Sequence, residues 1–324
     1  MPADRVGGGG AQDVGDAGEF ELIEAMRHRW GDLAAGIGDD AAQLRVPRGE
    51  IMVASTDAAV EGIHFRRDWL TLRECGYRAV TGALSDLAAM GAAPLGVLVA
   101  IQLPASDRGV LLDLADGIGD AARAAGTVIV GGNLSAGDAL GVTTTALGSA
   151  FAPLSRAGAR AGDRLYVTGA LGGPAAALRT LLSGGAPAPA LRERLAAPAA
   201  RIAEARWLAA NGATAAIDIS DGLAADARHL ARASGVVVEI DAGSVPVFDG
   251  ATPDDALAGG EEYELLVAAP AAPAAPAFDE DAFRRRFGVM LTPVGRIASG
   301  VSDVRLLEAG KRVAAPPGHD HFSR

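Results

Sequence analysis

Short apolar runs alternate with longer segments of helical periodicity along the whole chain, and this alternation limits the fold more than any other feature. Helices are predicted at residues 19–30, 71–91, 108–126, 172–185 and 223–235. Strands are predicted at residues 51–55, 94–104, 127–132, 142–151, 162–169, 215–220, 236–240 and 262–270, with a hairpin at 304–313. Elements in this order pack as helices against sheets. The pattern predicts an α/β protein (α+β type) with two layers per domain.

The length of 324 residues allows about two domains. The glycine-rich residues 1–18 are predicted to be a disordered tail, before an N-terminal domain at 19–152 and a C-terminal domain at 153–324. The start lacks a basic segment followed by an apolar one, and no apolar run approaches the ~20 residues that span a bilayer. We therefore expect a cytoplasmic protein with no membrane partner.

Composition excludes several kinds of site. The formal net charge of −11 repels a phosphate backbone, so nucleic acid is not expected as a partner. Cys75 is the single cysteine, which excludes an internal disulfide and a zinc site made of thiolates. The single lysine, Lys311, is not followed by Ser or Thr, so the chain has no Walker A loop.

Acidic and amide side chains follow the ends of three predicted strands. They are Asp57 after 51–55, Asn133 and Asp138 after 127–132, and Asp218 and Asp221 at the end of 215–220. Ligands of α/β proteins gather beyond the carboxyl ends of strands, so we expect these side chains to meet there.

Further carboxylates come from outside the strands. Asp39 and Asp40 are adjacent and have no Lys or Arg within four residues on either side, and Asp86 comes from a predicted helix. Carboxylates that converge repel one another unless a cation neutralises them. Oxygen ligands of this kind suit Mg²⁺, which also accepts substrate phosphates and water. The acids therefore predict a magnesium site.

Simpler interpretations remain for each residue taken alone. Turn formation explains Asp39, Asp40, Asp57 and Asp221 equally well. Asp86 shares a helical side with Arg78 and Ser85, which favours a solvated polar face. His64 is typical of a structural histidine, and His319 can be a tail residue with no role.

Seven segments together carry a recognisable pattern. They are GIGDDAA (36–42), STDAAVEGIHF (55–65), LSDLAAMGA (84–92), VGGN (130–133), IDISDG (217–222), GGEEYEL (259–265) and GHDHF (318–322). In this order, over about residues 18–322, the chain resembles the thiamine-monophosphate kinase family. Several of these motifs are shared with the wider superfamily of aminoimidazole-ribonucleotide synthetase and selenophosphate synthetase.

The resemblance implies phosphorylation of thiamine monophosphate to thiamine diphosphate, with ATP as co-substrate and several Mg²⁺ ions. It also implies N-terminal and C-terminal mixed-sheet domains of the aminoimidazole-ribonucleotide synthetase-like fold. A homodimer is expected, with ATP bound in the N-terminal domain near the dimer interface.

Matching the family motifs residue by residue implies three groups of site residues. The implied metal ligands are Asp40, Ser55, Thr56, Asp57, Asp86, Asn133, Asp218 and Asp221. The implied ATP contacts are Gly132, Asn133, Arg156 and Ser220. The implied substrate contacts are His64, Glu261 and His319.

Two positions depart from the family pattern. The family usually has Asp where this chain has Asn133, and an aromatic residue where it has His319. These departures keep two alternatives open, which are a sister enzyme of the superfamily and a catalytically impaired homologue that binds magnesium and nucleotide. Among the sister enzymes, selenophosphate synthetase would need a reactive cysteine in an N-terminal segment, whereas Cys75 lies in a predicted helix.

The implied reaction requires no general base, since its nucleophile is a phosphate oxygen that is already anionic. The obstacle is electrostatic: two unit negative charges ~4 Å apart repel by roughly 4 kcal/mol at an effective dielectric constant of ~20. Divalent ions that bridge phosphates remove this barrier and align the attack. We therefore expect the aspartates to hold metal, and we expect no catalytic acid or base.

Overall fold

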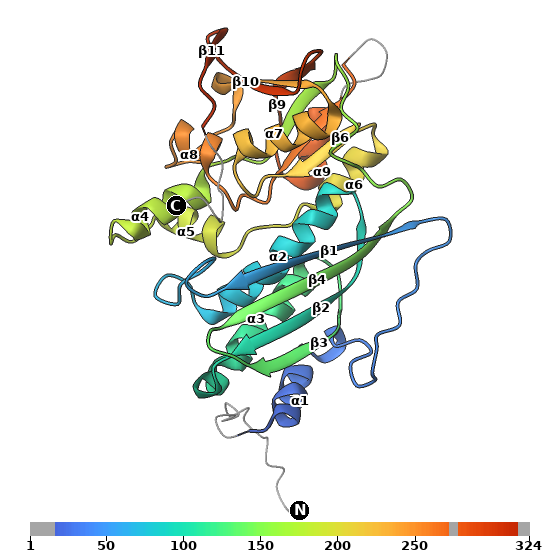
Figure 1. Cartoon of the computed structure of the whole chain (residues 1–324), viewed down its shortest axis with the longest axis vertical. Coiled ribbons are helices and arrows are strands. Elements are labelled where there is room, and N and C mark those ends of the chain that lie inside the picture. The colour runs from blue at the N-terminus through green and yellow to red at the C-terminus, as the bar shows by residue number, and fades with distance from the viewer. Residues whose placement is uncertain (1–16, 272–277, 317–324) are drawn as a thin grey trace, which may run out of the picture.

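The computed structural model describes residues 17–271 and 278–316. Residues 1–16 of the predicted disordered tail (1–18) and the predicted substrate contact His319 lie outside the described residues, whereas Gly18 is the N-cap of α1. Within them the chain forms two sheets with helices packed on them (Figure 1), which confirms the predicted fold class. None of the helices in the described ranges is both long and apolar enough to cross a membrane.

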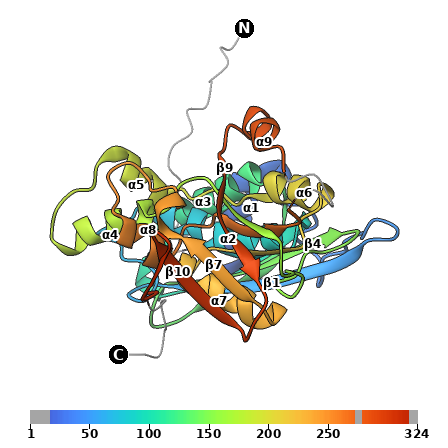
Figure 2. The same cartoon turned by 90° about the horizontal axis from the view of Figure 1, so that it is seen from above.

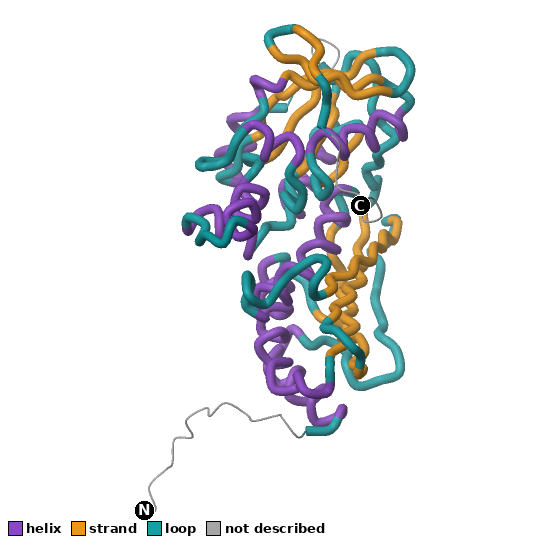
Figure 3. Tube along the Cα trace, turned by 60° about the vertical axis from the view of Figure 1, so that its left-hand side comes forward, coloured by secondary structure: helices purple, strands orange, loops and turns teal. Residues whose placement is uncertain are grey.

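The N-terminal half is a four-stranded mixed sheet in the order β1-β4-β2-β3. Its strands are β1 (Ile51–Val60), β2 (Ala93–Leu103), β3 (Ile129–Ala136) and β4 (Gly141–Ala150). Its helices are α1 (Glu19–Trp30), α2 (Leu72–Ala89) and α3 (Leu111–Ala124), with 3-10 turns η1 (Gly31–Leu33) and η2 (Ala105–Val110). Only β2 and β3 are parallel neighbours. The helices lie on one side of this sheet (Figure 3).

The C-terminal half is a seven-stranded mixed sheet in the order β11-β10-β7-β9-β5-β8-β6. Its strands are β5 (Arg164–Thr168), β6 (Ala215–Asp218), β7 (Val237–Asp241), β8 (Leu265–Ala269), β9 (Leu291–Ala298), β10 (Asp303–Glu308) and β11 (Lys311–Val313). Its helices are α4 (Gly173–Leu182), α5 (Pro189–Ala196), α6 (Ile202–Ala210), α7 (Leu223–Ser234), α8 (Pro253–Ala258) and α9 (Glu280–Phe287), with the 3-10 turn η3 (Ala242–Ser244). Figure 2 shows α4, α5 and α8 on one side, opposite α6 and α9.

Two predicted strands continue further than expected. β4 pairs with β1 along its whole length, so β1 reaches Val60 and Asp57 lies inside the strand, not after it. β3 continues to Ala136 beside β2, so Asn133 also lies inside a strand. The residues added to each strand are mostly small or polar. The apolar run in the sequence therefore ends earlier than the strand's hydrogen bonds to its neighbour. The predicted strand at 262–270 is in turn shorter, and begins at Leu265.

Helix α2 joins the two halves. It begins with a capping box, in which the Thr71 hydroxyl accepts from the Glu74 N–H and the Glu74 carboxylate accepts from the Thr71 N–H. Beyond the cap, the buried Arg78 donates to the Leu195 carbonyl of α5 and forms a 2.7 Å ion pair with Glu261. Residues on α2 are thereby held against loops of the C-terminal half (Figure 1).

A buried ionic cluster fixes the loop that leads into β8. Glu264 accepts from the Arg201 Nε at 2.8 Å and from the Thr168 hydroxyl at 2.7 Å, and Arg194 lies 3.2 Å away. Glu262 is equally buried, and it accepts from the Gly172 N–H at 2.5 Å. Burial raises the pKa of Glu262 to about 8. The two glutamates therefore differ: Glu264 pairs closely with Arg201 and Arg194, whereas Glu262 has only Arg194 at 3.4 Å and burial disfavours its ionised form.

We expect the two glutamates to respond differently to replacement by glutamine. Glu264→Gln leaves Arg201 without its charged partner in a buried position, so the free energy of unfolding should fall by about 3 kcal/mol. Glu262→Gln keeps an oxygen for the Gly172 N–H and removes an acid that resists ionisation, so the loss should stay below about 1 kcal/mol. Urea unfolding at pH 7 measures both. An equal or larger loss in Glu262→Gln would contradict this account of the cluster.

Candidate functional site

A cleft of about 830 Å³ lies between the two halves. Its walls come from β1 and the loop after it, α2, α4, the turn after β6 and the loop between α8 and β8. Seven of the residues singled out in the sequence line it: Asp57, His64, Asp86, Asp218, Ser220, Asp221 and Glu261. Segments far apart in the sequence are thus brought to one surface.

Three carboxylates form the acidic end of this cleft, which comprises Asp57 on β1, Asp86 on α2 and Asp218 at the end of β6. The Ser55 hydroxyl donates to Asp86, and the Ser85 hydroxyl donates to Asp218 at 2.8 Å. The polar side of α2 that the sequence assigned to solvent is therefore mostly buried, because it packs against β1 and β6.

The acidic end is electrostatically unfavourable without a counter-charge. Burial, and then the charge of Asp57, raise the pKa of Asp86, although the Ser55 hydrogen bond opposes this. Burial and the charge of Asp86 raise the pKa of Asp218 to about 6. Arg156 lowers both pKa values, but less than burial raises them. Carboxylates from three elements, two of them with raised pKa values, fit the ligand set of a divalent cation.

Gly82 on α2 makes room for Asp57. A Cβ atom at this position would lie 2.6 Å from the Asp57 Oδ2, which is closer than such atoms approach. The absence of a side chain on this turn of α2 therefore lets β1 present its carboxylate to the cleft.

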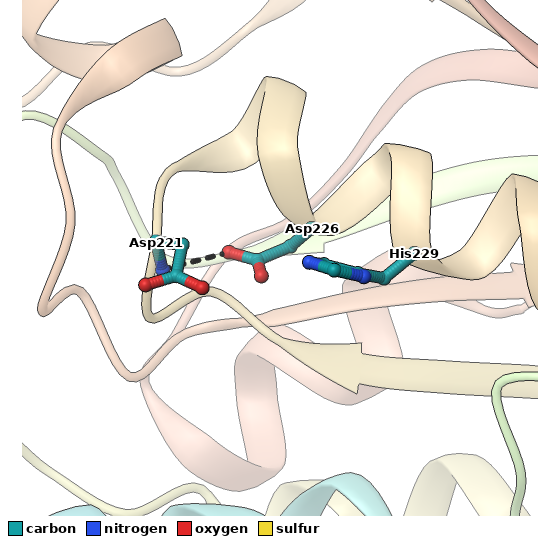
Figure 4. A group of neighbouring side chains, drawn as sticks. All are labelled: Asp221, Asp226 and His229. Carbon is teal, nitrogen blue, oxygen red and sulfur yellow. Dashed lines mark hydrogen bonds between the residues drawn. The ribbon is translucent and has the colours of Figure 1, made fainter. Parts of the chain in front are cut away.

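The turn after β6 carries Ser220 and Asp221 into the cleft. Behind it, the buried Asp226 of α7 accepts from the Ser220 N–H at 3.0 Å and from the Asp221 N–H at 3.1 Å (Figure 4). Burial, and then the charge of Asp218, raise the pKa of Asp226 to about 8. Side-chain ligand atoms of Asp221, Asp226 and His229 lie within 4.8 Å of one another.

The loop between α8 and β8 places two side chains in the cleft through an uncommon backbone. Glu261 and Tyr263 have φ angles of 59° and 53°, which side-chain-bearing residues rarely adopt. The Glu261 N–H donates to the Ser220 carbonyl at 2.8 Å, and the Tyr263 N–H donates to the Ile219 carbonyl at 2.9 Å. The loop is therefore tied to the same turn that carries Ser220.

His64 is held by the backbone and also lines the cleft. Its imidazole Nδ1 accepts from the Val60 N–H at 3.1 Å, and the backbone N–H of His64 donates to the Val60 carbonyl. The first bond places the neutral imidazole proton on Nε2. The structural role and the substrate-side role expected from the sequence are thus compatible.

Part of the cleft lining is apolar. Phe65, Trp69 and Leu178 line it, with Ile63 and Leu182 at its margin, and the last two are 69% and 67% exposed. The guanidinium of Arg66 lies 4.3 Å from the centre of the Trp69 ring. An aromatic face that already holds a cation can hold a cationic ligand.

Other predicted residues lie away from this cleft. Asp40 is exposed, and its N–H bonds to the Asp39 carboxylate in a local turn. Thr56 faces the other side of β1 and contacts Thr145. Gly132 and Asn133 lie on β3, which is separated from β1 by β4 and β2.

Asn133 and Asp57 do not share one ion within this chain. Neighbouring strands lie about 4.8 Å apart, so the backbones of β1 and β3 are about 14 Å apart. The register places Asn133 beside Ala100 on the face opposite that of Asp57. Magnesium ligands lie about 2.1 Å from the ion, so these two side chains belong to different centres.

Sequence reasoning missed several residues that shape the cleft. Gly82, Tyr263 and Asp226 were not singled out, and Arg78 and Ser85 appeared only as part of a polar helix face. The signal for Tyr263 was its place inside the GGEEYEL segment. Asp226 could have been noticed as an acidic residue in the first turn of the helix that follows the Asp-Gly pair.

We expect Gly82→Ala to weaken Mg²⁺ binding without destabilising the fold. The new methyl group displaces the Asp57 carboxylate, and small shifts of ligand positions cost about 10-fold or more in metal affinity. Alanine also favours a helix over glycine. Titration calorimetry measures the affinity and a thermal melt the stability.

Gly76→Ala is the matched control, because its Cβ atom would lie 2.2 Å from the Leu114 carbonyl of α3. It should lower the melting temperature instead. Unchanged Mg²⁺ affinity in Gly82→Ala would show that Asp57 is not a ligand.

Comparison with known proteins follows the same division. Residues 38–150 match the AIR synthase related protein N-terminal domain, and residues 160–301 match the C-terminal domain. The thiamine-monophosphate kinase of Salmonella typhimurium is 34% identical over 94% of this chain and 98% of its own length.

Solved structures agree with this. The thiamine-monophosphate kinase of Stenotrophomonas maltophilia superposes with a TM-score of 0.78 at 33% identity, covering 91% of this chain and 98% of its own. AaThiL, solved in complex with AMPPCP and TMP, superposes with a TM-score of 0.74 at 31% identity, covering 94% and 97%. The chain belongs to the thiamine-monophosphate kinase family.

Proposed function

We propose that this chain transfers the terminal phosphoryl group of ATP to thiamine monophosphate, giving thiamine diphosphate. The observation that carries the proposal is a single cleft lined both by carboxylates and by aromatic and apolar side chains. The carboxylates suit cations that carry phosphates, and the aromatic side chains suit a cationic heterocycle. The relative AaThiL, which binds AMPPCP and TMP, supports the same pair of ligands.

We assign the cation site to the acidic end of the cleft. Asp57, Asp86 and Asp218 fit a magnesium site because they are oxygen donors from three elements that line one cleft, and burial raises the pKa of Asp86 and Asp218. Asp221 lines the same cleft from the turn after β6. When bound, Mg²⁺ neutralises phosphate charge and aligns the reacting oxygens. Ser55 and Ser85 hold the carboxylates in place through their hydroxyl groups.

The remaining predicted metal and nucleotide residues stay proposals. Asp40, Thr56 and Asn133 would belong to a second centre outside the cleft. Arg156 already acts on the charges of Asp86 and Asp218, which supports a role near phosphates. Gly132 has a φ of 159° and lies so close to Val99 that no Cβ atom would fit.

The substrate side is assigned to the loop after β1 and the loop before β8. Trp69 offers a face to the heterocycle of thiamine monophosphate, with Arg66 moving aside for the thiazolium charge. His64 is held by the backbone of Val60 and Glu261 by Arg78, and both side chains line the cleft on this side. The acceptor phosphate then lies toward Asp57, where the cations would screen it.

We further propose a homodimer in the cytoplasm, where ATP is available. Support for the dimer comes from the side of the N-terminal sheet that its helices leave uncovered. The register places small side chains there, including Thr56, Ala58, Ala100 and Thr143, so that a second sheet can approach closely. The proposed domains are residues 19–152, which would bind ATP and magnesium and form the dimer, and residues 153–324.

Purified protein with ATP, thiamine monophosphate and Mg²⁺ should form thiamine diphosphate, and a metal chelator should abolish the product.

Asp57→Asn removes one ligand charge, so turnover should fall by at least about 100-fold, as expected for the loss of several kcal/mol of charge stabilisation. Asp303→Asn on β10, which pairs with Arg312 at the surface, is the control and should keep full activity. Chromatography of the products decides this. Nucleotide binding without product would favour the impaired homologue, and full activity in Asp57→Asn would remove that residue from the metal site.

The acceptor should be a phosphate monoester and not an alcohol. A phosphate oxygen is already anionic, whereas the hydroxyl group of thiamine must first lose a proton, and the aspartates that line the cleft are assigned to cation binding, while Glu261 is paired with Arg78. With thiamine in place of thiamine monophosphate, we expect no phosphorylated product in the time that the enzyme needs to convert thiamine monophosphate completely. Thiamine monophosphate appearing in that assay would contradict direct attack by the phosphate.

A further inference from the structure

Asp226 has no place in the cleft wall, and yet it contacts the turn that lines it. It lies in the first turns of α7, is 2% exposed, and one oxygen accepts both the Ser220 N–H and the Asp221 N–H (Figure 4). We propose that Asp226 is a positioning residue for phosphoryl transfer, which holds the Ser220–Asp221 turn in the geometry that presents Asp221 to the cations. This inference rests on the proposed function.

The cost of placing an acid here indicates that the position is used. A buried polar side chain costs free energy unless its hydrogen-bonding atoms find partners. The compensation for Asp226 is the pair of backbone N–H groups and its place near the positive N-terminus of α7. Those two N–H groups belong to the turn that the cleft requires.

The turn is held from two sides, and Asp226 provides one of them. On the carbonyl side, Ser220 accepts from the Glu261 N–H and Ile219 accepts from the Tyr263 N–H. On the amide side, Asp226 accepts from both N–H groups. Losing Asp226 would thus free the amide side while the carbonyl side keeps the turn in the fold. The expected result is a folded protein in which the position of the Asp221 carboxylate is no longer fixed.

The turn has little other means of fixing its amides. Gly222, which follows it, has a φ of 109°, and a Cβ atom there would lie 2.7 Å from the Ala258 carbonyl. Its carbonyl accepts from the Asp226 N–H at 2.9 Å and so begins α7. The helix start and the turn therefore share Asp226, which reaches back over Gly222.

Two substitutions separate the acceptor oxygen from the charge. Asp226→Asn keeps an oxygen that can accept both N–H groups, so turnover and the half-saturating Mg²⁺ concentration should stay within about threefold of wild type. Asp226→Ala removes the acceptor, so turnover should fall by about 100-fold, as for a misplaced reacting group. The half-saturating Mg²⁺ concentration should rise by about 10-fold. Hydrogen exchange of residues 219–222 should accelerate in Asp226→Ala and not in Asp226→Asn.

Asp279→Ala is the matched control. Asp279 accepts from the Ala282 N–H at 2.8 Å at the start of α9, whose Phe283 packs against Trp207 on the side of the molecule opposite α4 and α8 (Figure 2). It should lower the melting temperature with unchanged turnover and Mg²⁺ dependence. His229→Gln tests whether Asp221, Asp226 and His229 act together as a cation site, and we expect it to leave the Mg²⁺ dependence unchanged.

Wild-type turnover and Mg²⁺ dependence in Asp226→Ala would overturn the positioning role. So would a loss of turnover in Asp226→Asn as large as the loss in Asp226→Ala. A rise in the half-saturating Mg²⁺ concentration in His229→Gln equal to that in Asp226→Ala would also overturn it. If wild-type protein forms no thiamine diphosphate, the proposed function fails on its own. Mg²⁺ affinity by calorimetry and the exchange rates of residues 219–222 still decide whether Asp226 positions the turn.

Discussion

Repulsion among the carboxylates at the acidic end of the cleft is the constraint on which the rest of the structure depends. Asp57, Asp86 and Asp218 come from three elements, and burial raises the pKa of the last two. The protein brings these charges together and orients Asp86 and Asp218 with serine hydroxyl donors, while the charge of Arg156 offsets their burial only in part. Such a site is poised for a divalent cation with phosphates, which provides a physical reason for the kinase chemistry of the family.

The architecture holds this unfavourable cluster in place from both halves. Helix α2 carries Asp86 and gives space to Asp57 through Gly82, while Arg78 ties the helix to Glu261. In the C-terminal half, the cluster around Glu264 fixes the loop before β8, and that loop is bonded to the turn after β6. The left-handed backbone of Glu261 and Tyr263 persists because these bonds hold it on either side.

The sequence allowed the fold class, the two-half organisation and much of the cleft to be predicted. Asp57, Asp86, Asp218 and Asp221 were recognisable as acids beside small residues, and the structure places all four at one cleft. What escaped prediction depends on tertiary contact. The length of β1 follows from its partner β4, and the burial of Ser85 follows from packing against the C-terminal half. Asn133 was expected with these acids because nothing in the sequence gives the strand order that separates β3 from β1.

The central claim is that the acidic end of the cleft binds the cations that carry the phosphates. Crystals grown with Mn²⁺, a non-hydrolysable ATP analogue and thiamine monophosphate test it most directly, because anomalous scattering locates Mn²⁺ independently of any assumed ligand. The account predicts a peak bonded to carboxylate oxygens of Asp57, Asp86 or Asp218 and to phosphate oxygens. Phosphates bound with Mn²⁺ elsewhere, and none of these three carboxylates in contact with an ion, would contradict it.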